Sequence, residues 1–289
     1  MARRCVKEGN DLTVSPEGYG LLTALALDPI EKKPLYHFYP GSFIVSAGGY
    51  GCNLKCPFCQ NHEISLSEYS GSLPSGISGM ASARGTENTP SGDISFDMPD
   101  VRYYSPEELT LICAKYRKAG NIGIAFTYNE PTIIPEYIVD TARLIRSEGM
   151  KTVLVTNGSA SDETLDKILP WIDAMNIDLK SFDREYYKKV LHGDLDTVLN
   201  FITRSARSCH VEVTTLIIPG ENDSDEEMMS IASWLAQTGK KSGRDIPFHI
   251  SRFFPRSVYS KRKPTDTGRI YELSDIARKY LRFVHEGNV

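Results

Sequence analysis

The sequence predicts an α/β fold on a parallel sheet, which is either doubly wound or a barrel, complete or partial. Six short apolar runs alternate with segments of helical pattern. Six such β-α units predict parallel strands joined by right-handed crossovers. Polar side chains follow several of the apolar runs, at the strand ends where α/β folds bind their ligands. Periodicity alone does not choose between the sheet and the barrel.

The expected strands are Phe43–Ala47, Ile122–Phe126, Thr152–Thr156, Ala174–Leu179, Val211–Ile218 and Phe248–Phe253. Helices are expected between them. Ser105-Pro-Glu-Glu108 has the pattern of a capping box with Pro at the first helical position, and the helix it opens should end before Gly120. An apolar stripe at helical spacing lies between residues 133 and 149. Ser161 and Ser224 are expected N-caps, because acidic residues follow each of them.

The chain has 289 residues, of which 40% are hydrophobic, so it can bury one large core. Residues 67–100 are rich in Ser, Gly, Thr and Pro, which is typical of an insertion. That insertion is either a lid over the site or a surface loop without a role. We expect residues 1–42 to be an N-terminal extension packed on a core formed by residues 43–289.

The formal net charge of −4 gives no general electrostatic reason to bind nucleic acid. The one basic run, residues 261–263, is expected to be a solvated loop. The chain has no apolar run near eighteen residues and no apolar segment of a secretory signal, so we expect no membrane span and a cytoplasmic location. Cys113 and Cys209 are expected to be buried apolar residues.

Three of the six cysteines, Cys52, Cys56 and Cys59, lie within eight residues. Glycines just before them let the backbone turn closely around a metal centre. A cubic [4Fe–4S] cluster takes four thiolates, so three would leave one iron open to another ligand. His62 allows an alternative, a closed Cys3His zinc site without catalysis. A coincidence of ordinary thiols is the remaining alternative.

Three motifs that end predicted strands carry polar side chains: Thr127–Pro131, Val155–Gly158 and Asn176–Lys180. A carboxylate at Glu130 or Asp178 suits an ammonium group or a cation. The ammonium group of Lys180 suits a carboxylate, and Asn157 suits ribose hydroxyls. Each motif taken singly is equally typical of a turn or a salt bridge.

The chain resembles the radical S-adenosylmethionine (radical SAM) enzymes related to pyruvate formate-lyase activating enzyme. It is more closely similar to the radical SAM member of the AmmeMemoRadiSam system. The three-then-two spacing of the cysteines resembles the signature of the superfamily. The matching stretches are Asp28–Phe38, Gly51–Ser65, Thr127–Pro131, Val155–Gly158, Asp173–Lys180, Glu212–Asp223 and His249–Pro255. They run over most of residues 20–289 apart from the insertion.

The resemblance implies a partial (β/α)6 barrel, TIM-like and of the radical SAM type, with the N-terminal extension and the Ser/Gly-rich insertion added to it. It implies that Cys52, Cys56 and Cys59 ligate a [4Fe–4S] cluster, whose open iron binds SAM. In that superfamily, an electron from the cluster cleaves SAM to methionine and a 5′-deoxyadenosyl radical.

The cofactor contacts implied by the resemblance are Phe58, Tyr128, Asn129, Glu130, Asn157, Asp178 and Lys180. In relatives, the position of Phe58 touches the adenine and the segment of Asn157 lies near the ribose. The segment that contains Glu130 binds the methionine amino group, and that of Asp178 lies near the carboxylate.

This chain also departs from the pattern of its relatives. Tyr128 and Asn129 stand where the common motif has two glycines. Val155 stands where pyruvate formate-lyase activating enzyme has an Asp that helps to bind a monovalent cation, so a cation site is not expected. Phe254 stands where activating enzymes offer a His toward SAM.

The predicted function is therefore reductive cleavage of SAM followed by hydrogen abstraction. In one version, the enzyme activates a glycyl-radical enzyme by taking hydrogen from a glycine of that partner protein. In the other, it acts on a small molecule or on a different protein. An RNA-modifying enzyme would need a basic face near the barrel mouth. Relatives point to reduced flavodoxin or ferredoxin as the electron donor.

Overall fold

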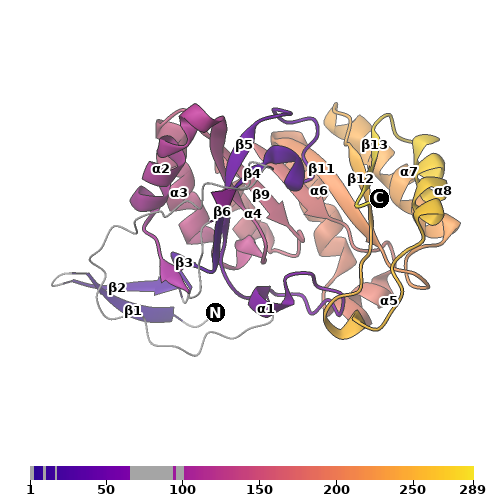
Figure 1. Cartoon of the computed structure of the whole chain (residues 1–289), viewed down its shortest axis with the longest axis horizontal. Coiled ribbons are helices and arrows are strands. Elements are labelled where there is room, and N and C mark those ends of the chain that lie inside the picture. Colours follow the sequence, from indigo (N-terminus) through magenta and orange to yellow (C-terminus); the bar gives the residue numbers. More distant parts are fainter. Residues whose placement is uncertain (1–2, 9–10, 17, 66–93, 96–100) are drawn as a thin grey trace.

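The computed structural model describes residues 3–8, 11–16, 18–65, 94–95 and 101–289 (Figure 1). A nine-stranded sheet in the order β13-β12-β11-β10-β9-β8-β5-β4-β6 forms its centre. Seven of these strands pair in parallel: β5 (Phe43–Gly48), β8 (Asn121–Phe126), β9 (Lys151–Thr156), β10 (Ala174–Asp178), β11 (His210–Ile217), β12 (Phe248–Arg252) and β13 (Val284–Gly287). Among the described strands, β13 and β6 at the two ends of this order do not pair, so the sheet is open, and the expected partial barrel is confirmed.

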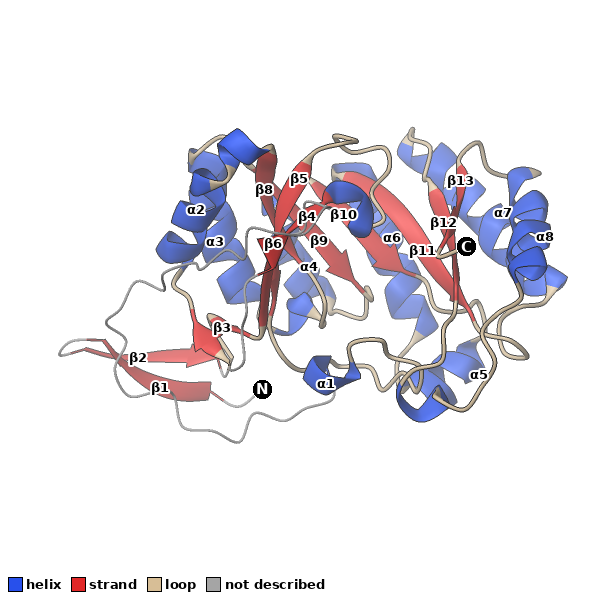
Figure 2. Ribbon diagram, viewed as in Figure 1, coloured by secondary structure: helices blue, strands red, loops and turns tan. Residues whose placement is uncertain are grey.

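The helices that connect the parallel strands cover one face of this sheet (Figure 2). They are α2 (Pro106–Lys115), α3 (Pro135–Ser147), α4 (Asp162–Ile168), α6 (Leu195–Ser208), α7 (Asp225–Ser242) and α8 (Thr267–Arg278). Two short helices, α1 (His62–Ser65) and α5 (Arg184–Tyr186), follow strand ends, and a π-helical turn (Tyr187–Leu191) continues α5. Within the described residues, no helix is both long enough and apolar enough to cross a membrane.

The predicted elements agree closely with the structure. Each of the six predicted strands is found, with both ends within one residue of the prediction. Ser105 and Glu108 form the expected capping box at the start of α2, and a 3-10 turn after α2 ends at Gly120, whose φ is 90°. Ser161 and Ser224 cap α4 and α7, each accepting a hydrogen bond from a backbone N–H three residues on.

The N-terminal part of the chain contributes to the central sheet, whereas the sequence predicted only an extension packed on the core. β4 (Ala24–Pro29) pairs antiparallel with β5 and with β6 (Ile94–Ser95). β3 (Leu21–Leu22) pairs with β7 (Arg102–Tyr103), and β1 (Arg3–Glu8) pairs with β2 (Asp11–Pro16). The domain boundary between residues 42 and 43 stays a prediction. Apart from β6, the insertion at 67–100 lies outside the described residues.

Apolar side chains fill both faces of the sheet. On the outer face they pack against the helices, and Cys113 and Cys209 are buried there as expected. On the inner face a smaller cluster joins the strands to the segment after β4, through Ile30 and Leu35. The segment after β4 therefore covers part of the inner face and contributes to the core there.

Candidate functional site

The loop that carries the three cysteines lies between β5 and α1, where it meets the carboxyl ends of β8, β9 and β10. Asn129, just after β8, holds this loop by three backbone contacts. Its Oδ1 accepts from the Gly49 N–H at 3.0 Å, and its Nδ2 donates to the carbonyls of Tyr50 and Gly51 at 3.2 and 3.1 Å. Gly51 has a φ of 82°, a conformation that glycine adopts without strain. Asn129 therefore shapes the cysteine loop.

The thiol of Cys52 lies close to the end of β9. The Nδ2 atom of Asn157 lies 3.6 Å from Cys52 Sγ and donates to Asn53 Oδ1 at 2.9 Å. The Sγ of Cys59 lies 3.0 Å from Ser65 Oγ in α1. All three cysteines are half-buried as residues.

Burial favours the protonated form of two of these thiols when no metal is bound. It raises the pKa of Cys52 to about 12, and the nearby carboxylate of Glu130 acts in the same direction. Burial raises the pKa of Cys56 to about 11, although the positive charge of Lys180 opposes it. A metal centre that binds here must therefore displace protons from the thiols, as thiolate ligation requires.

The donor chemistry of the loop fits an iron–sulfur cluster. Three thiols supply soft sulfur ligands for iron. His62, the fourth ligand of the zinc alternative, directs its Nδ1 toward the Cys59 carbonyl oxygen at 3.3 Å. Among the described residues, no three Cys, His, Asp or Glu side chains are arranged around one point as metal ligands. The assignment of Cys52, Cys56 and Cys59 as metal ligands therefore rests on the chemistry of their thiols and on their position in the fold.

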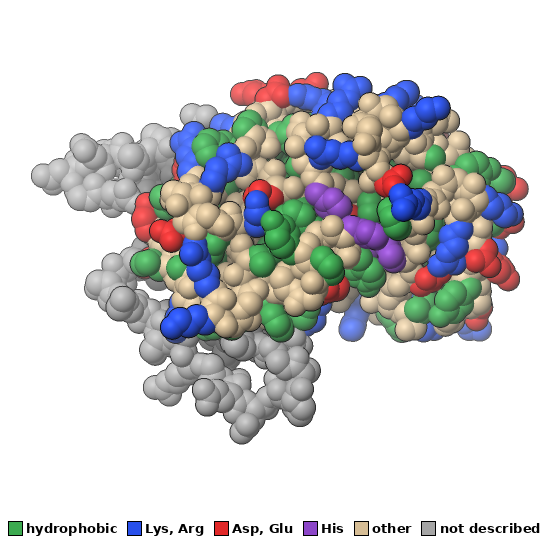
Figure 3. All heavy atoms as spheres, turned by 90° about the horizontal axis from the view of Figure 1, so that it is seen from above, with side chains coloured by type: hydrophobic (Ala, Val, Ile, Leu, Met, Phe, Trp, Pro, Cys, Tyr) green, Lys and Arg blue, Asp and Glu red, His purple; other side chains and the backbone are tan. Residues whose placement is uncertain are grey.

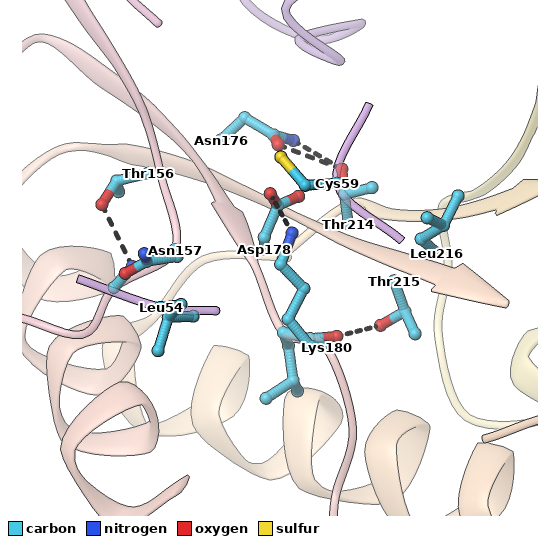
Figure 4. Close-up of polar contacts among 12 residues, drawn as sticks. Leu54, Cys59, Thr156, Asn157, Asn176, Asp178, Lys180, Thr214, Thr215 and Leu216 are labelled. Carbon is cyan, nitrogen blue, oxygen red and sulfur yellow. Dashed lines mark hydrogen bonds and ion pairs between the residues drawn. The ribbon is translucent and has the colours of Figure 1, made fainter. Parts of the chain in front are cut away.

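Asp178 and Lys180 end β10 and form an ion pair with Nζ and Oδ2 2.6 Å apart (Figure 4). Burial lowers the pKa of Lys180, but the charge of Asp178 outweighs it and holds that pKa above its usual range. Both side chains act electrostatically on the Cys56 thiol. The structure therefore brings this pair and the cysteine loop together, as their positions at strand ends predict.

Glu130 ties the end of β8 to the end of β9. Its Oε1 accepts from the hydroxyls of Thr132 and Thr156 at 2.6 and 2.7 Å, and its Oε2 accepts from the Asn157 N–H at 2.7 Å. Burial raises its pKa despite these hydrogen bonds. Only 2% of the residue is exposed, so its main role in this structure is to position Asn157.

Tyr128 turns away from the cysteines and lies along the inner face of the sheet. Its φ is 72°, and its hydroxyl donates to Asp28 Oδ2 at 2.6 Å. The buried Lys33 donates to the same Oδ2 at 2.7 Å. A side chain at Gly48 would meet the Tyr128 ring at 2.7 Å, so the absence of a Cβ there makes room for it. This network was not predicted, and the motif Asp28–Phe38 was the only signal of it in the sequence.

Phe58 is buried against the loop that follows β12. Its ring lies 6.2 Å from that of Tyr259, and the Tyr259 N–H donates to the Pro57 carbonyl at 3.2 Å. Phe254, in the same loop, is 45% exposed and packs beside Arg252. The loop after β12 is thus a wall of the candidate site.

Comparison with known proteins adds sequence relatives and a shared fold. The Radical SAM superfamily matches residues 47–232. An uncharacterized protein of Methanocaldococcus jannaschii is 35% identical over 274 residues, which cover 94% of this chain and 72% of that protein. The 4-hydroxyphenylacetate decarboxylase activating enzyme of Clostridioides difficile is 28% identical over 166 residues, covering 54% of this chain and 52% of that enzyme. The match thus spans about half of the activating enzyme's length.

The crystal structure of Streptococcus suis SuiB bound to S-adenosylmethionine has a TM-score of 0.54 to this chain at 14% identity. The superposition covers 82% of this chain and 48% of SuiB. At this identity the likeness shows a common fold.

Proposed function

The chain belongs to the radical SAM superfamily, and from that premise we propose that it is an activating enzyme that takes a hydrogen atom from a glycine of a partner protein. The family's cofactors, a [4Fe–4S] cluster and SAM, are the cofactors of this enzyme. The activating enzyme among its relatives supports a protein substrate. The observation that carries the proposal is the position of three thiols beside the carboxyl ends of β8, β9 and β10.

We assign the cluster to Cys52, Cys56 and Cys59, which offer three sulfur ligands and leave the fourth iron to SAM. When bound, the cluster and SAM supply the electron and the carbon radical that hydrogen abstraction requires. No side chain supplies such chemistry itself, so the chain's own residues hold, orient and shield the reactants.

The SAM contacts divide into direct and indirect ones. Asp178 and Lys180 offer one charge of each sign, which complements the ammonium and carboxylate groups of the methionine part. Phe58 offers an apolar surface for the adenine, and Asn157 offers an amide near the cluster loop. Glu130 acts by fixing the backbone of Asn157.

Tyr128 and Asn129 also act indirectly in this assignment, because their side chains are engaged within the protein. Asn129 fixes the cysteine loop, and Tyr128 joins β8 to Asp28. The segment that they form can still offer backbone groups to the methionine part.

The loop after β12 supports an acidic protein as electron donor. It contacts the cysteine loop through Pro57, and it carries the exposed Arg256, Lys261 and Lys263. Val258 in the same loop is 74% exposed. A basic surface with an apolar residue beside the cluster loop complements an acidic carrier such as reduced flavodoxin or ferredoxin. A reducing compartment preserves free thiols, so we place the enzyme in the cytoplasm.

The decisive experiment is SAM cleavage by the full chain after anaerobic reconstitution with iron and sulfide. After reduction, we expect 5′-deoxyadenosine and methionine from the wild type and from Cys209→Ala, whose thiol is buried elsewhere. Cys56→Ala should form neither product. A colourless protein that holds one zinc and cleaves no SAM would contradict the assignment and favour the zinc module.

A second measurement tests the protein substrate. The reduced enzyme and SAM are mixed with a candidate glycyl-radical enzyme, and the EPR spectrum is recorded. A glycyl-radical doublet that requires Cys56 supports activation. SAM cleavage that a small molecule stimulates, without any protein radical, would favour the small-molecule version.

A further inference from the structure

Glu221 joins three segments that follow the carboxyl ends of neighbouring strands, and the proposed function does not use it. It lies in the turn after β11, and 12% of its side chain is exposed. Its contacts come from α5, which follows β10, and from the loop after β12. Figure 3 shows the opposite face, turned away from α1, where histidine side chains gather. The carboxylate lies instead at the end of the barrel that carries the cysteine loop.

The turn that carries Glu221 is fixed by its neighbour Asn222. The Oδ1 atom of Asn222 accepts from the Ile218 N–H at 2.7 Å, and its Nδ2 donates to the Lys180 carbonyl at 2.7 Å. Only 1% of Asn222 is exposed. Because Lys180 belongs to the charged pair after β10, these bonds set the position of the turn relative to the candidate SAM site.

Both oxygens of Glu221 have partners from other segments. Its Oε2 accepts from the Tyr186 hydroxyl at 2.5 Å, and its Oε1 lies 2.5 Å from a guanidinium nitrogen of Arg262. The Tyr259 hydroxyl also hydrogen-bonds to this carboxylate, and burial together with that contact raises the pKa of Tyr259 to about 12. The guanidinium of Arg262 lies 3.5 Å from the centre of the Tyr259 ring. One carboxylate thus holds a tyrosine and an arginine of the same loop side by side.

The loop after β12 meets the cysteine loop through the same tyrosine. The Tyr259 N–H donates to the Pro57 carbonyl at 3.2 Å, and the Tyr259 ring lies 6.2 Å from that of Phe58. Tyr186, the other tyrosine on the carboxylate, is close enough to Cys56 for the two side chains to interact electrostatically. Two of the three partners of the carboxylate therefore lie beside the cysteine loop.

We propose that Glu221 is a positioning residue for SAM, which holds the loop after β12 on the cysteine loop so that Tyr259 supports Phe58 as the wall for the adenine. This inference rests on the proposed function, because it takes Phe58 as the adenine contact. Glu221 acts through Tyr259 and Arg262. A carboxylate suits this role because it accepts from two hydroxyls and a guanidinium at once, whereas an amide of the same size has one acceptor oxygen and no charge for Arg262.

The first test is amide hydrogen exchange of the cluster-loaded full chain without SAM. A hydrogen bond to a charged group is strong enough that Glu221→Gln should raise local opening, and with it exchange in residues 254–264, about tenfold or more. The matched control is Asp162→Asn, since Asp162 pairs with Arg204 between α4 and α6 and should leave this loop unchanged. Equal exchange in the wild type and Glu221→Gln would overturn the proposal.

Equilibrium binding of SAM measures the consequence for the site. We expect Glu221→Gln to weaken SAM binding about tenfold, as is typical when a group that orients a ligand contact is lost, while the iron content stays that of the wild type. Equal SAM affinity in the wild type and Glu221→Gln would overturn the proposal. A wild type that binds no SAM would contradict the proposed function itself, and with it the adenine wall, whatever the exchange shows.

A double-mutant cycle tests whether Glu221 acts through Arg262. Arg262→Met removes the same ion pair from its more exposed side, so it should weaken SAM binding even if Glu221→Gln folds poorly, which circular dichroism would show. The double variant should bind SAM no more weakly than Glu221→Gln alone, because the two groups act as a unit. Fully additive losses would overturn this route from Glu221 to SAM.

Discussion

At the scale of single residues, Asp178 tests the assignment of the SAM contacts. Its side chain is 31% exposed at the end of β10, so it can exchange part of its contact with Lys180 for the ammonium group of SAM. A hydrogen bond to a charged group contributes roughly 1.5–3 kcal/mol, so Asp178→Ala should weaken SAM binding by about tenfold to a hundredfold. The iron content should stay that of the wild type.

Equilibrium binding of SAM to the cluster-loaded protein measures this effect. Asp173→Ala is the matched control, since Asp173 lies before the other end of β10 and pairs with Lys151. Unchanged SAM affinity in Asp178→Ala would remove Asp178 from the site. An equal loss in both variants would point to a general effect on β10.

Asn129 makes a second prediction at this scale. Asn129→Ala leaves one N–H and two carbonyls of the cysteine loop without their side-chain partner. Unpaired buried polar groups cost roughly 1–3 kcal/mol each, and a looser loop holds its cluster less firmly. We expect a lower melting temperature and fewer irons per chain after reconstitution. Asn200→Ala, at an exposed asparagine of α6, should change neither, and a fully loaded Asn129→Ala would contradict the role.

At the scale of elements, Gly123 shows how closely β8 and β9 approach each other. A Cβ at Gly123 would lie 1.8 Å from the Lys151 carbonyl oxygen, which is backbone and cannot turn aside. Gly123→Ala should therefore separate the two strands that carry Glu130 and Asn157. Overpacking typically costs 1–3 kcal/mol, so we expect at least about 2 kcal/mol, measured by urea unfolding.

The control is Gly41→Ala, where a Cβ meets nothing within 4 Å and only the φ of 79° is unfavourable. That substitution should cost about 1 kcal/mol. Equal costs at the two positions would show that the β8–β9 contact adjusts freely.

The predictability of each element depends on how its side chains are buried. The six strands of the parallel core could be predicted because burial on both faces gives continuous apolar runs. β13 was missed because only Val284 of its four residues is buried. β4 was missed because a strand that pairs antiparallel at the start of the chain has no β-α unit to mark it.

In the candidate site too, residues marked by a local sequence pattern could be predicted, and contacts between residues far apart in the sequence could not. The cysteine loop and the strand ends could be predicted, since the carboxyl ends of parallel strands meet at one edge. The contact of Tyr128 with Asp28 joins residues 100 positions apart, and that of Tyr36 with Glu212 joins residues 176 apart. Only the assembled barrel brings such pairs together, so neither contact leaves a local pattern in the sequence.

At the scale of the whole molecule, the segment from β4 to His37 holds the barrel together. β4 extends the sheet, the Pro34 carbonyl accepts from Asn176 at 2.8 Å, and Glu212 accepts two backbone N–H groups. These contacts reach β10 and β11, which lie four and five strands away from β4 in the sheet order. The segment therefore couples the two sides of a barrel that the sheet itself leaves open.

The stability of this arrangement should depend on acid through Asp28. Burial raises the pKa of this carboxyl, but Lys33 and the Tyr128 hydroxyl outweigh it and lower the pKa from 3.8 to about 2. Because the pKa of Asp28 is lower in the folded protein, the stabilisation by Asp28 is complete at pH values above its pKa in the unfolded chain. It is lost as the pH falls from about 4 to about 2. The shift corresponds to roughly 2 kcal/mol of unfolding free energy.

The variant Asp28→Asn/Lys33→Met isolates this contribution, because it removes both charges and so leaves no unpaired Lys33 in the core. The free energy of unfolding is measured by urea titration at pH values from 6 to 2 for both proteins. Acid releases the iron–sulfur cluster and protonates other carboxylates in both proteins. Only the difference between their free energies of unfolding therefore reports on Asp28. We expect the wild type to lose about 2 kcal/mol relative to the variant between pH 4 and pH 2. A constant difference across that range would show that Asp28 and Lys33 do not hold the N-terminal segment by their charges.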